Sequence, residues 1–203
     1  MIALGMPSPI GHALAGVAAA WTVDLLPGDR VWRTAPASAS WFKRAGNGLT
    51  LSCAALGAAP DLDLLFSTHR TGTHSFAAVV FVGLIAAVLA ANAGRPVARV
   101  ALMCASAYAT HLLLDWLGAD NYPPFGIQAF WPFSHEWFIS GTDLFRQTAR
   151  QQVFTPASML KNVKAIVQEL AILGPTAAAL WLVRVKALSG LAPEMSGRDH
   201  PPQ

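Results

Sequence analysis

Long apolar stretches separated by short polar ones are the main feature of this chain. The clearest stretch runs from Phe76 to Asn92 and carries no charged side chain. A helix needs about 17–25 apolar residues to cross the hydrocarbon core of a bilayer, so this stretch is long enough for one span. Similar patterns predict four more helices, over residues 10–26, 48–59, 100–117 and 170–185. We therefore expect an all-α, multi-span transmembrane helical bundle with three to five spans.

A short polar region separates the second predicted helix from the third. Pro60 disfavours helix at the residue before it, which predicts that the second helix ends there. Asp61 and Asp63 come next, and residues two positions apart project to the same side of an extended or turn segment. Residues 67–75 then form a polar loop in which Gly72 provides a hinge.

The chain after the fourth predicted helix is less regular. Residues 121–138 contain three prolines and seven aromatic residues, which is typical of a structured surface loop or of a lid over a site. Residues 156–165 are predicted to form a short amphipathic helix that leads into the last span. Residues 190–203 are rich in proline and glycine and are expected to be disordered. Residues 1–189 are thus expected to form a single membrane-embedded domain, with 118–165 as its surface loop or lid.

The composition supports a membrane location. Hydrophobic residues make up 54% of the chain and charged residues only 12%, against about 25% in ordinary soluble domains. There are 14 basic and 11 acidic residues, a net charge of +3, and the basic residues form no stripe interleaved with aromatic residues. A nucleic-acid partner is therefore not expected. Membrane lipid is the partner that this composition favours.

The distribution of lysine and arginine indicates which side of the membrane each polar segment occupies. With five spans, the linker at 27–47, the turn at 93–99 and the C-terminal segment lie on one side and are rich in basic residues. The positive-inside rule places this side in the cytoplasm. The loop at 67–75 then lies on the other side, with Arg70 as its single arginine. The candidate ligands described next all fall at this outer, non-cytoplasmic boundary.

Histidine and aspartate side chains at this boundary are candidate metal ligands. His111 and Asp115 are four positions apart, so they share one face of a helix. They could bind one cation together, or Asp115 could orient the imidazole of His111 as a ligand. The alternative is a satisfied polar pair inside a helix bundle. Polar groups at membrane depth are costly and usually functional, which favours the metal hypothesis.

The region from Asp61 to His74 adds further candidates. Asp61 and Asp63 could ligate metal, or they could be solvated carboxylates at a helix end. An aspartate between two ions could bridge them, and we assign this catalytic position to Asp63. His69 and His74 flank Arg70, which could bind anionic substrate oxygens bidentately or serve as an interfacial anchor.

His12 is the remaining candidate ligand. On its own it would more often be a core histidine, but the other candidates at the same boundary favour a ligand role. Histidine and aspartate ligands without cysteine suit zinc better than manganese or iron. Such ions lower the pKa of a bound water and polarise a phosphoryl or acyl oxygen, which predicts hydrolysis. The competing hypothesis is a non-catalytic membrane protein that binds metal for structure, sensing or transport.

The chain resembles the YdjM/DUF457 family of membrane-bound, metal-dependent hydrolases over about residues 8–135. The resemblance lies in five runs that occur in order: P-S-P-I-G-H-A-L-A-G, A-P-D-L-D-L-L-F, H-R-T-G-T-H-S, H-L-L-L-D-W and W-P-F-S. That family is in turn remotely similar to zinc-dependent phospholipase C and P1-type nucleases. The resemblance implies a multi-pass protein of the bacterial inner membrane. Our hypothesis for its substrate is a small-molecule or lipid phosphoester at the outer boundary.

The resemblance also implies a set of metal ligands: His12, Asp61, Asp63, His69, His74, His111 and Asp115. The chain has no later H-x-x-x-E pair of the kind that the soluble zinc enzymes use, because His135 and Glu136 are adjacent. This departure predicts one or two zinc ions rather than three. The expected function is a membrane-bound hydrolase that uses metal-activated water, with Asp63 and Arg70 in catalytic positions.

Overall fold

The computed structural model describes residues 7–27, 46, 48–66, 69–149 and 152–189 of the chain. The predicted disordered tail and nearly all of the predicted linker lie outside these residues. The described part is all-helical, as predicted, and contains two isolated β-bridges but no β-sheet. Its elements are α1 (Pro9–Leu25), α3 (Gly48–Ala58), the 3₁₀ helices η1 (Ala59–Phe66) and η2 (Gly72–His74), α4 (Phe76–Asn92), α5 (Val97–Leu117) and α6 (Pro156–Ser189).

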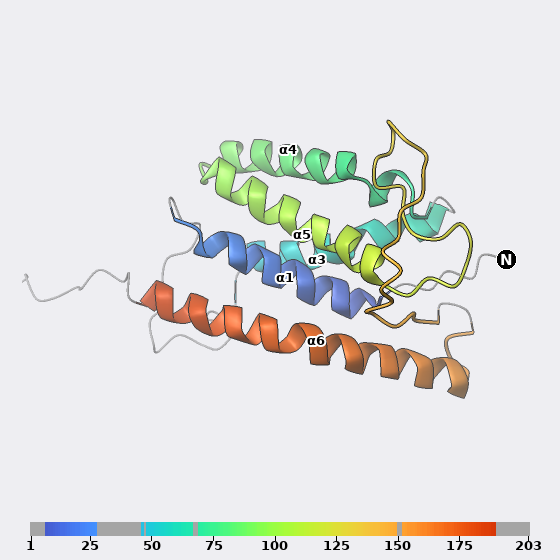
Figure 1. The fold of residues 1–203 in the computed structure, drawn as a ribbon. Coiled ribbons are helices and arrows are strands. Elements are labelled where there is room, and N and C mark those ends of the chain that lie inside the picture. Colours follow the sequence, from blue (N-terminus) through green and yellow to red (C-terminus); the bar gives the residue numbers. More distant parts are fainter. Residues whose placement is uncertain (1–6, 28–45, 47, 67–68, 150–151, 190–203) are drawn as a thin grey trace, which may run out of the picture.

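The five α-helices run side by side along one long axis (Figure 1). α1 lies in the middle and packs against α3, α5 and α6, while α4 packs against α5. The described residues include three helical segments that are long and apolar enough to cross a membrane, at Gly48–Leu65, Val97–Leu117 and Pro156–Lys186. α4 is also apolar but shorter. The prediction of a multi-span helical bundle is therefore confirmed.

The outward surface of α4 is apolar, as a bilayer requires. On α4, the side chains of Phe81, Leu84 and Leu89 are 62%, 61% and 62% exposed. Large apolar side chains in water would cost about 25 cal/mol for each Å² left exposed. Contact with lipid tails removes this cost, so α4 is suited to face the membrane interior.

α1 and α3 approach each other closely because glycines meet where they cross. A Cβ atom on Gly57 would lie 3.2 Å from the Cα of Gly16 and would clash with the carbonyl oxygen of His12. A Cβ atom on Gly16 would lie 2.6 Å from the carbonyl oxygen of Cys53. Small residues allow membrane helices to pack at such short distances. This contact places the end of α3 directly beside His12.

Most helix boundaries agree with the sequence, but the region after Pro60 does not. The predicted extended or turn segment is wrong, because the chain continues as the 3₁₀ helix η1. Proline is tolerated in the first turn of a helix, where its missing N–H has no partner to lose. A 3₁₀ helix has about three residues per turn, so side chains two positions apart point to different sides. Asp61 and Asp63 therefore reach different neighbours.

The predicted amphipathic helix at 156–165 and the predicted span at 170–185 belong to the same helix. α6 is one continuous helix of 34 residues. Its polar first half binds the backbone of the segment that precedes it. Asn162 bonds to the N–H and carbonyl of Ala149, and Gln168 bonds to two further backbone groups of the same segment. These hydrogen bonds provide partners for polar side chains in the first half of α6. The first half can therefore be polar while the second half is apolar, within one helix.

A buried ion pair joins α1 and α6 at the opposite end of the bundle from the candidate ligands. Nε of Arg184 lies 3.2 Å from an oxygen of Asp24, and both side chains are almost fully buried. The guanidinium also lies over the ring of Trp21, 5.9 Å from its centroid. The pair therefore fixes the C-terminal half of α6 against α1.

Candidate metal centre

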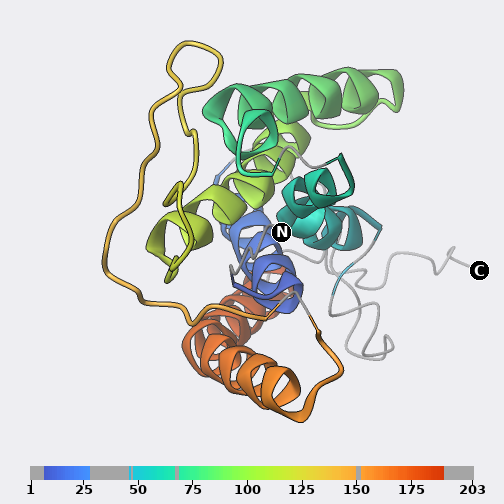
Figure 2. The same ribbon diagram turned by 90° about the vertical axis from the view of Figure 1, so that its right-hand side faces the viewer.

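Four separate segments bring the candidate ligands to one end of the bundle. They are the start of α1, the helix η1, the loop that contains η2, and the end of α5. All four lie toward the right in Figure 1, the side that faces the viewer in Figure 2. The alternating directions of the helices thus collect residues from His12 to Asp115 in one place.

The inner cluster consists of His12, His74, His111 and Asp115. One carboxylate oxygen of Asp115 lies 3.3 Å from Nε2 of His12. The other oxygen lies 3.3 Å from Nε2 of His74 and also from Nε2 of His111. All four side chains are buried with 0% exposure. Three imidazoles and one carboxylate therefore converge inside the protein, out of contact with solvent.

These separations fit a bound metal ion. Zinc binds histidine nitrogen and carboxylate oxygen at about 2.0–2.2 Å, so two ligands of a tetrahedral ion lie about 3.3 Å apart. Asp115 has this spacing to each of the three histidines. Both its oxygens and both ring nitrogens of His12 are buried without a hydrogen-bond partner among the described residues. A buried carboxylate without hydrogen bonds is costly, and a cation would remove that cost.

A hydrogen bond on the far side of the ring aims His111 at the cluster. Nδ1 of His111 lies 2.8 Å from the carbonyl oxygen of Gly57. A carbonyl oxygen can only accept, so Nδ1 donates and Nε2 is the ring nitrogen that faces the cluster. Metal-binding histidines are usually held in this way by their second ring nitrogen. The close approach of α3 at Gly57 supplies the acceptor.

The outer cluster consists of Asp61, His69 and His74. The ligand atoms of these three residues lie within 4.8 Å of one another. The ligand atoms of His12, His111 and Asp115 form a second group with the same property. The two groups adjoin, because Nε2 of His111 lies 3.7 Å from an oxygen of Asp61. The side chain of Asp61 is 10% exposed, so the outer cluster lies closer to the surface. Together the two groups could hold metal ions.

Asp63 occupies a different position from Asp61. Its Oδ1 lies 2.6 Å from Nδ1 of His69, and its Oδ2 lies 3.1 Å from Nδ1 of His74. The same Oδ2 accepts hydrogen bonds from the hydroxyl of Thr73 at 2.5 Å and from the backbone N–H of Arg70 at 3.2 Å. Asp63 thus orients two imidazoles through their Nδ1 atoms, so a metal ion would be ligated through Nε2. Its role as a bridging ligand stays a prediction, since both oxygens already face these donors.

His74 lies between the carboxylates of Asp63 and Asp115, and these two charges favour the protonated form of its ring. Burial lowers the pKa of His74 by penalising the charged imidazolium, but Asp115 and Asp63 outweigh burial and raise the pKa to about 9. Without a metal ion, the ring therefore holds a proton at neutral pH. That proton supplies positive charge where a cation would otherwise lie.

Arg70 is buried beside the clusters and is bound to another part of the chain. Its guanidinium forms an ion pair with Asp120, and Nη2 lies 3.5 Å from the carbonyl oxygen of Tyr122. Its backbone has a φ of 67°, which is uncommon for a residue other than glycine. Arg70 thus links the ligand-bearing loop to the segment after α5. Binding of an anionic substrate by Arg70 stays a prediction and requires this ion pair to open.

Two further residues that support the ligands were not predicted from the sequence. Thr73 donates to Asp63, and the hydroxyl of Tyr108 donates to the backbone carbonyl of Thr73 at 2.7 Å. Tyr108 lies one helical turn before His111 on α5, a spacing that places both on the same side of the helix. The sequence could have indicated only that Tyr108 shares a helix face with His111. It could not have indicated that Tyr108 bonds to the carbonyl of Thr73.

Glu169 of α6 was also missed, although it holds the start of α1. It is fully buried and accepts hydrogen bonds from the hydroxyl of Ser8 and from the backbone N–H of Ser8, the latter at 2.7 Å. A Cβ atom on Gly11 would lie 2.5 Å from its carboxylate, so a larger residue there would displace Glu169 from Ser8. The available signal was an acidic residue inside an apolar span, which is usually functional or paired. Glu169 thereby fixes the turn of α1 that presents His12.

The segment between α5 and α6 packs against the ligand-bearing loop. The backbone N–H of Gln128 donates to the carbonyl of Arg70 at 3.0 Å, and that of Phe76 donates to the carbonyl of Ala129 at 2.8 Å. The ring of Trp131 would lie 3.4 Å from a Cβ atom on Gly72. In Figure 2 this segment runs beside the ends of α4 and α5. Its function as a lid stays a prediction.

Comparison with known proteins identifies one family. No curated protein and no solved structure matches the chain. The family model described as YdjM inner membrane protein matches residues 6–188, a range that contains every candidate ligand. This match agrees with the resemblance seen in the motifs around His12, Asp61 and His111. The chain therefore belongs to the YdjM inner membrane protein family.

Proposed function

We propose that the protein is a membrane-bound, metal-dependent hydrolase that acts on phosphoester or lipid-like substrates. The proposal rests on the convergence of the inner cluster, in which the oxygens of Asp115 lie 3.3 Å from three imidazoles without a hydrogen-bond partner among the described residues. The ligands would hold one or two ions, and zinc suits them best. The inner ion would be held by His12, His111 and Asp115, and an outer ion by Asp61, His69 and His74.

A zinc ion bound here would supply a water of lowered pKa and would polarise a phosphoryl oxygen. The chain's own groups prepare the site for this chemistry. Asp63 holds the rings of His69 and His74, and the carbonyl of Gly57 holds the ring of His111. Because Asp61 is the more exposed ligand, substrate would approach from the outer cluster.

We place the centre on the non-cytoplasmic side of the inner membrane. The turn between α4 and α5 lies at the opposite end of the bundle from the ligands and carries Arg95, and Arg99 lies in the first turn of α5. Arg184 lies near that end too, where it pairs with α1. The positive-inside rule assigns the arginine-rich end to the cytoplasm. The metal end would then face the periplasm.

The alternative is a protein that binds metal without catalysing a reaction. The burial of the inner cluster favours it, because structural zinc sites are closed whereas catalytic sites keep a position open for water or substrate. The partial exposure of Asp61 favours the enzyme instead. Activity is therefore the measurement that decides between the two.

The test measures metal content and hydrolysis together. Detergent-purified protein, wild type and the variants Asp61→Ala and His111→Ala, is loaded with zinc and assayed on a chromogenic phosphodiester. We expect one or two ions and measurable hydrolysis in the wild type, and a lower metal content with loss of hydrolysis in each variant. The exposed acid Asp143 provides a matched control, since Asp143→Asn should change neither quantity. Stoichiometric metal without hydrolysis of any phosphoester would support the non-catalytic alternative, and equal metal content in all variants would overturn both.

A further inference from the structure

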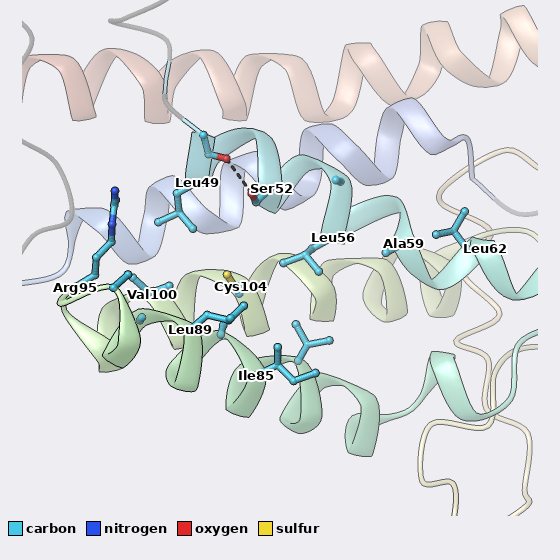
Figure 3. A pocket seen from close by; sticks show the side chains of 16 residues that line it. Leu49, Ser52, Leu56, Ala59, Leu62, Ile85, Leu89, Arg95, Val100 and Cys104 are labelled. Atoms are coloured by element: carbon cyan, nitrogen blue, oxygen red, sulfur yellow. Dashed lines mark hydrogen bonds between the residues drawn. The ribbon is translucent and has the colours of Figure 1, made fainter.

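An apolar groove of about 760 Å³ lies between α3 and α4, with α5 behind it (Figure 3). This volume is within the range of about 300–1,000 Å³ that is typical of small-molecule sites. Its walls are formed by Leu49 and Leu56 of α3 and by Ile85 and Leu89 of α4, while Cys104 of α5 lies at the back. The groove is therefore large enough for a ligand and is lined by hydrocarbon.

The groove is lined by helices that are candidate membrane spans, and several of its lining side chains are exposed. It is lined by two of the candidate spans, Gly48–Leu65 and Val97–Leu117. Three of its lining side chains are exposed, Leu62 at 61%, Ile85 at 44% and Leu89 at 62%. An occupant would therefore enter from the bilayer rather than from water.

The walls offer no polar partner along their length. The hydroxyl of Ser52 donates to the backbone carbonyl of Gly48 in its own helix, at 2.9 Å (Figure 3). Arg95 is the one charged residue among those that line the groove, and it lies at the turn between α4 and α5. Apolar walls without a free donor or acceptor bind hydrocarbon chains, whose burial is favourable without hydrogen bonds.

The two ends of the groove differ in chemistry. Ala59 and Leu62 of η1 line one end, and Leu62 lies between Asp61 and Asp63 in the sequence. That end adjoins the metal centre, whereas Arg95 marks the other end (Figure 3). α4 runs along the groove for 17 residues, or about 25 Å. A molecule lying in the groove would therefore have one end beside the ligands and the other near the opposite boundary.

We propose that this groove binds an acyl chain of a phospholipid whose phosphate lies at the metal centre. The inference rests on the proposed hydrolase function and names its substrate class, a long-chain lipid phosphoester. A cation held by Asp61 and its neighbours attracts the phosphate, and the apolar walls take the chain. The chain therefore points away from the metal centre and toward Arg95.

Photolabelling tests the groove without relying on activity. Full-length, zinc-loaded protein in phospholipid nanodiscs is exposed to phosphatidylglycerol that carries a diazirine either near the ester carbonyl or at the end of one acyl chain. We expect the first probe to label η1 around Leu62 and the second to label α4 around Leu89. Labelling spread evenly over the outward faces of α4 and α6 would overturn the proposal, because it would show ordinary surrounding lipid. Labelling in the reverse order would overturn the orientation.

A variant that fills the groove provides the second arm. Ala55 lines the groove and is exposed, so tryptophan can be placed there without disturbing the core. Ala55→Trp should reduce labelling about tenfold, the factor expected when about two buried methylene groups lose their contacts. Ala91 is an exposed alanine of α4 that does not line the groove, and Ala91→Trp is the matched control with unchanged labelling. Both variants should keep the metal content of the wild type. Equal labelling of the groove in Ala55→Trp and Ala91→Trp would overturn the proposal.

Hydrolysis separates failure of this inference from failure of the proposed function. Ala55→Trp should keep the wild-type rate on a soluble chromogenic phosphodiester and lose about tenfold in kcat/KM on the long-chain lipid. An unchanged rate on the lipid would overturn the substrate assignment while leaving the hydrolase intact. Specific labelling of the groove with no hydrolysis of either compound would overturn the hydrolase and leave lipid binding in place.

Discussion

The Nε2 atoms of His74 and His111 lie 3.1 Å apart inside the bundle, although 37 positions separate the two residues. His111 donates from Nδ1 to the carbonyl of Gly57, so its Nε2 is the ring nitrogen that faces His74. A second imidazole nitrogen at this distance must either bring a proton or share a cation. His74 brings the proton when no metal is bound, because its pKa is raised to about 9. The pair is thus arranged to exchange a proton for a metal ion.

The first prediction concerns Asp115, whose carboxylate contacts all three imidazoles of the inner cluster. Asp115→Asn keeps the shape of the side chain but removes its charge. We expect zinc affinity to fall by more than about 100-fold, a larger loss than outer hydrogen-bonding residues cause. Metal content after dialysis against a weak chelator measures this. Asp143→Asn should retain its zinc, and retention by Asp115→Asn as well would rule out the inner site.

The second prediction separates a ligand from a residue that orients ligands. Asp63 faces the Nδ1 atoms of His69 and His74, so Asp63→Asn should weaken zinc binding by about 10–100-fold without abolishing it. Asp61→Asn, which removes a ligand of the outer cluster, should eliminate the more weakly held ion altogether. Zinc titration by calorimetry distinguishes a changed affinity from a changed stoichiometry. Loss of a whole ion in Asp63→Asn would make Asp63 a ligand instead.

The third prediction follows from the proton on His74. Its pKa in the metal-free protein is raised to about 9, so the imidazolium form predominates below that pH and must lose its proton when zinc binds. Zinc affinity should therefore rise about tenfold for each pH unit between about 7 and 9, and should level off above 9. Competition with a chelator of known pH dependence measures this slope. An affinity that stays constant between pH 7 and 8 would contradict the assignment.

The fourth prediction tests whether Arg70 binds substrate or anchors the loop. If its contribution is only the ion pair with Asp120, then Arg70→Ala and Asp120→Ala should lower activity and stability by similar amounts. If Arg70 also binds the phosphate, Arg70→Ala should raise KM further than Asp120→Ala does, by about tenfold for one lost charge-assisted hydrogen bond. Kinetics of both variants with zinc-saturated protein give the comparison. A lower KM in Arg70→Ala would fit neither role.

The fifth prediction concerns the buried pair of Asp24 and Arg184, far from the metal end. Removing one partner leaves a buried charge without compensation, so Asp24→Asn should reduce the free energy of unfolding by about 3–5 kcal/mol. The double variant Asp24→Asn, Arg184→Met should recover part of this loss, because no unpaired charge remains. Thermal unfolding in detergent measures both. Zinc content should stay at the wild-type level in the variants that fold, which distinguishes this pair from the metal centre.

Local properties of the sequence predicted the helices and the chemistry of the site. Hydropathy over 76–92 is a property of neighbouring residues, and α4 coincides with that stretch. Histidine and aspartate are distinctive side chains in an apolar chain, so His12, His111 and Asp115 were identifiable before their contacts were known. The geometry of η1 and the continuity of α6 were not predictable in the same way. They depend on hydrogen bonds to segments that are distant in the sequence.

The order of residues alone predicts an apolar helical bundle with polar residues concentrated at a few helix ends. Which atoms of those residues face each other depends on how the helices pack. That packing turned Asp63 toward the Nδ1 atoms of two histidines, paired Arg70 with Asp120, and brought Glu169 to the start of α1. The physical reason is that apolar burial depends on the sum of many similar side chains and tolerates small errors in position. The choice of a hydrogen-bond partner depends on distances and angles that are set only when the helices have packed.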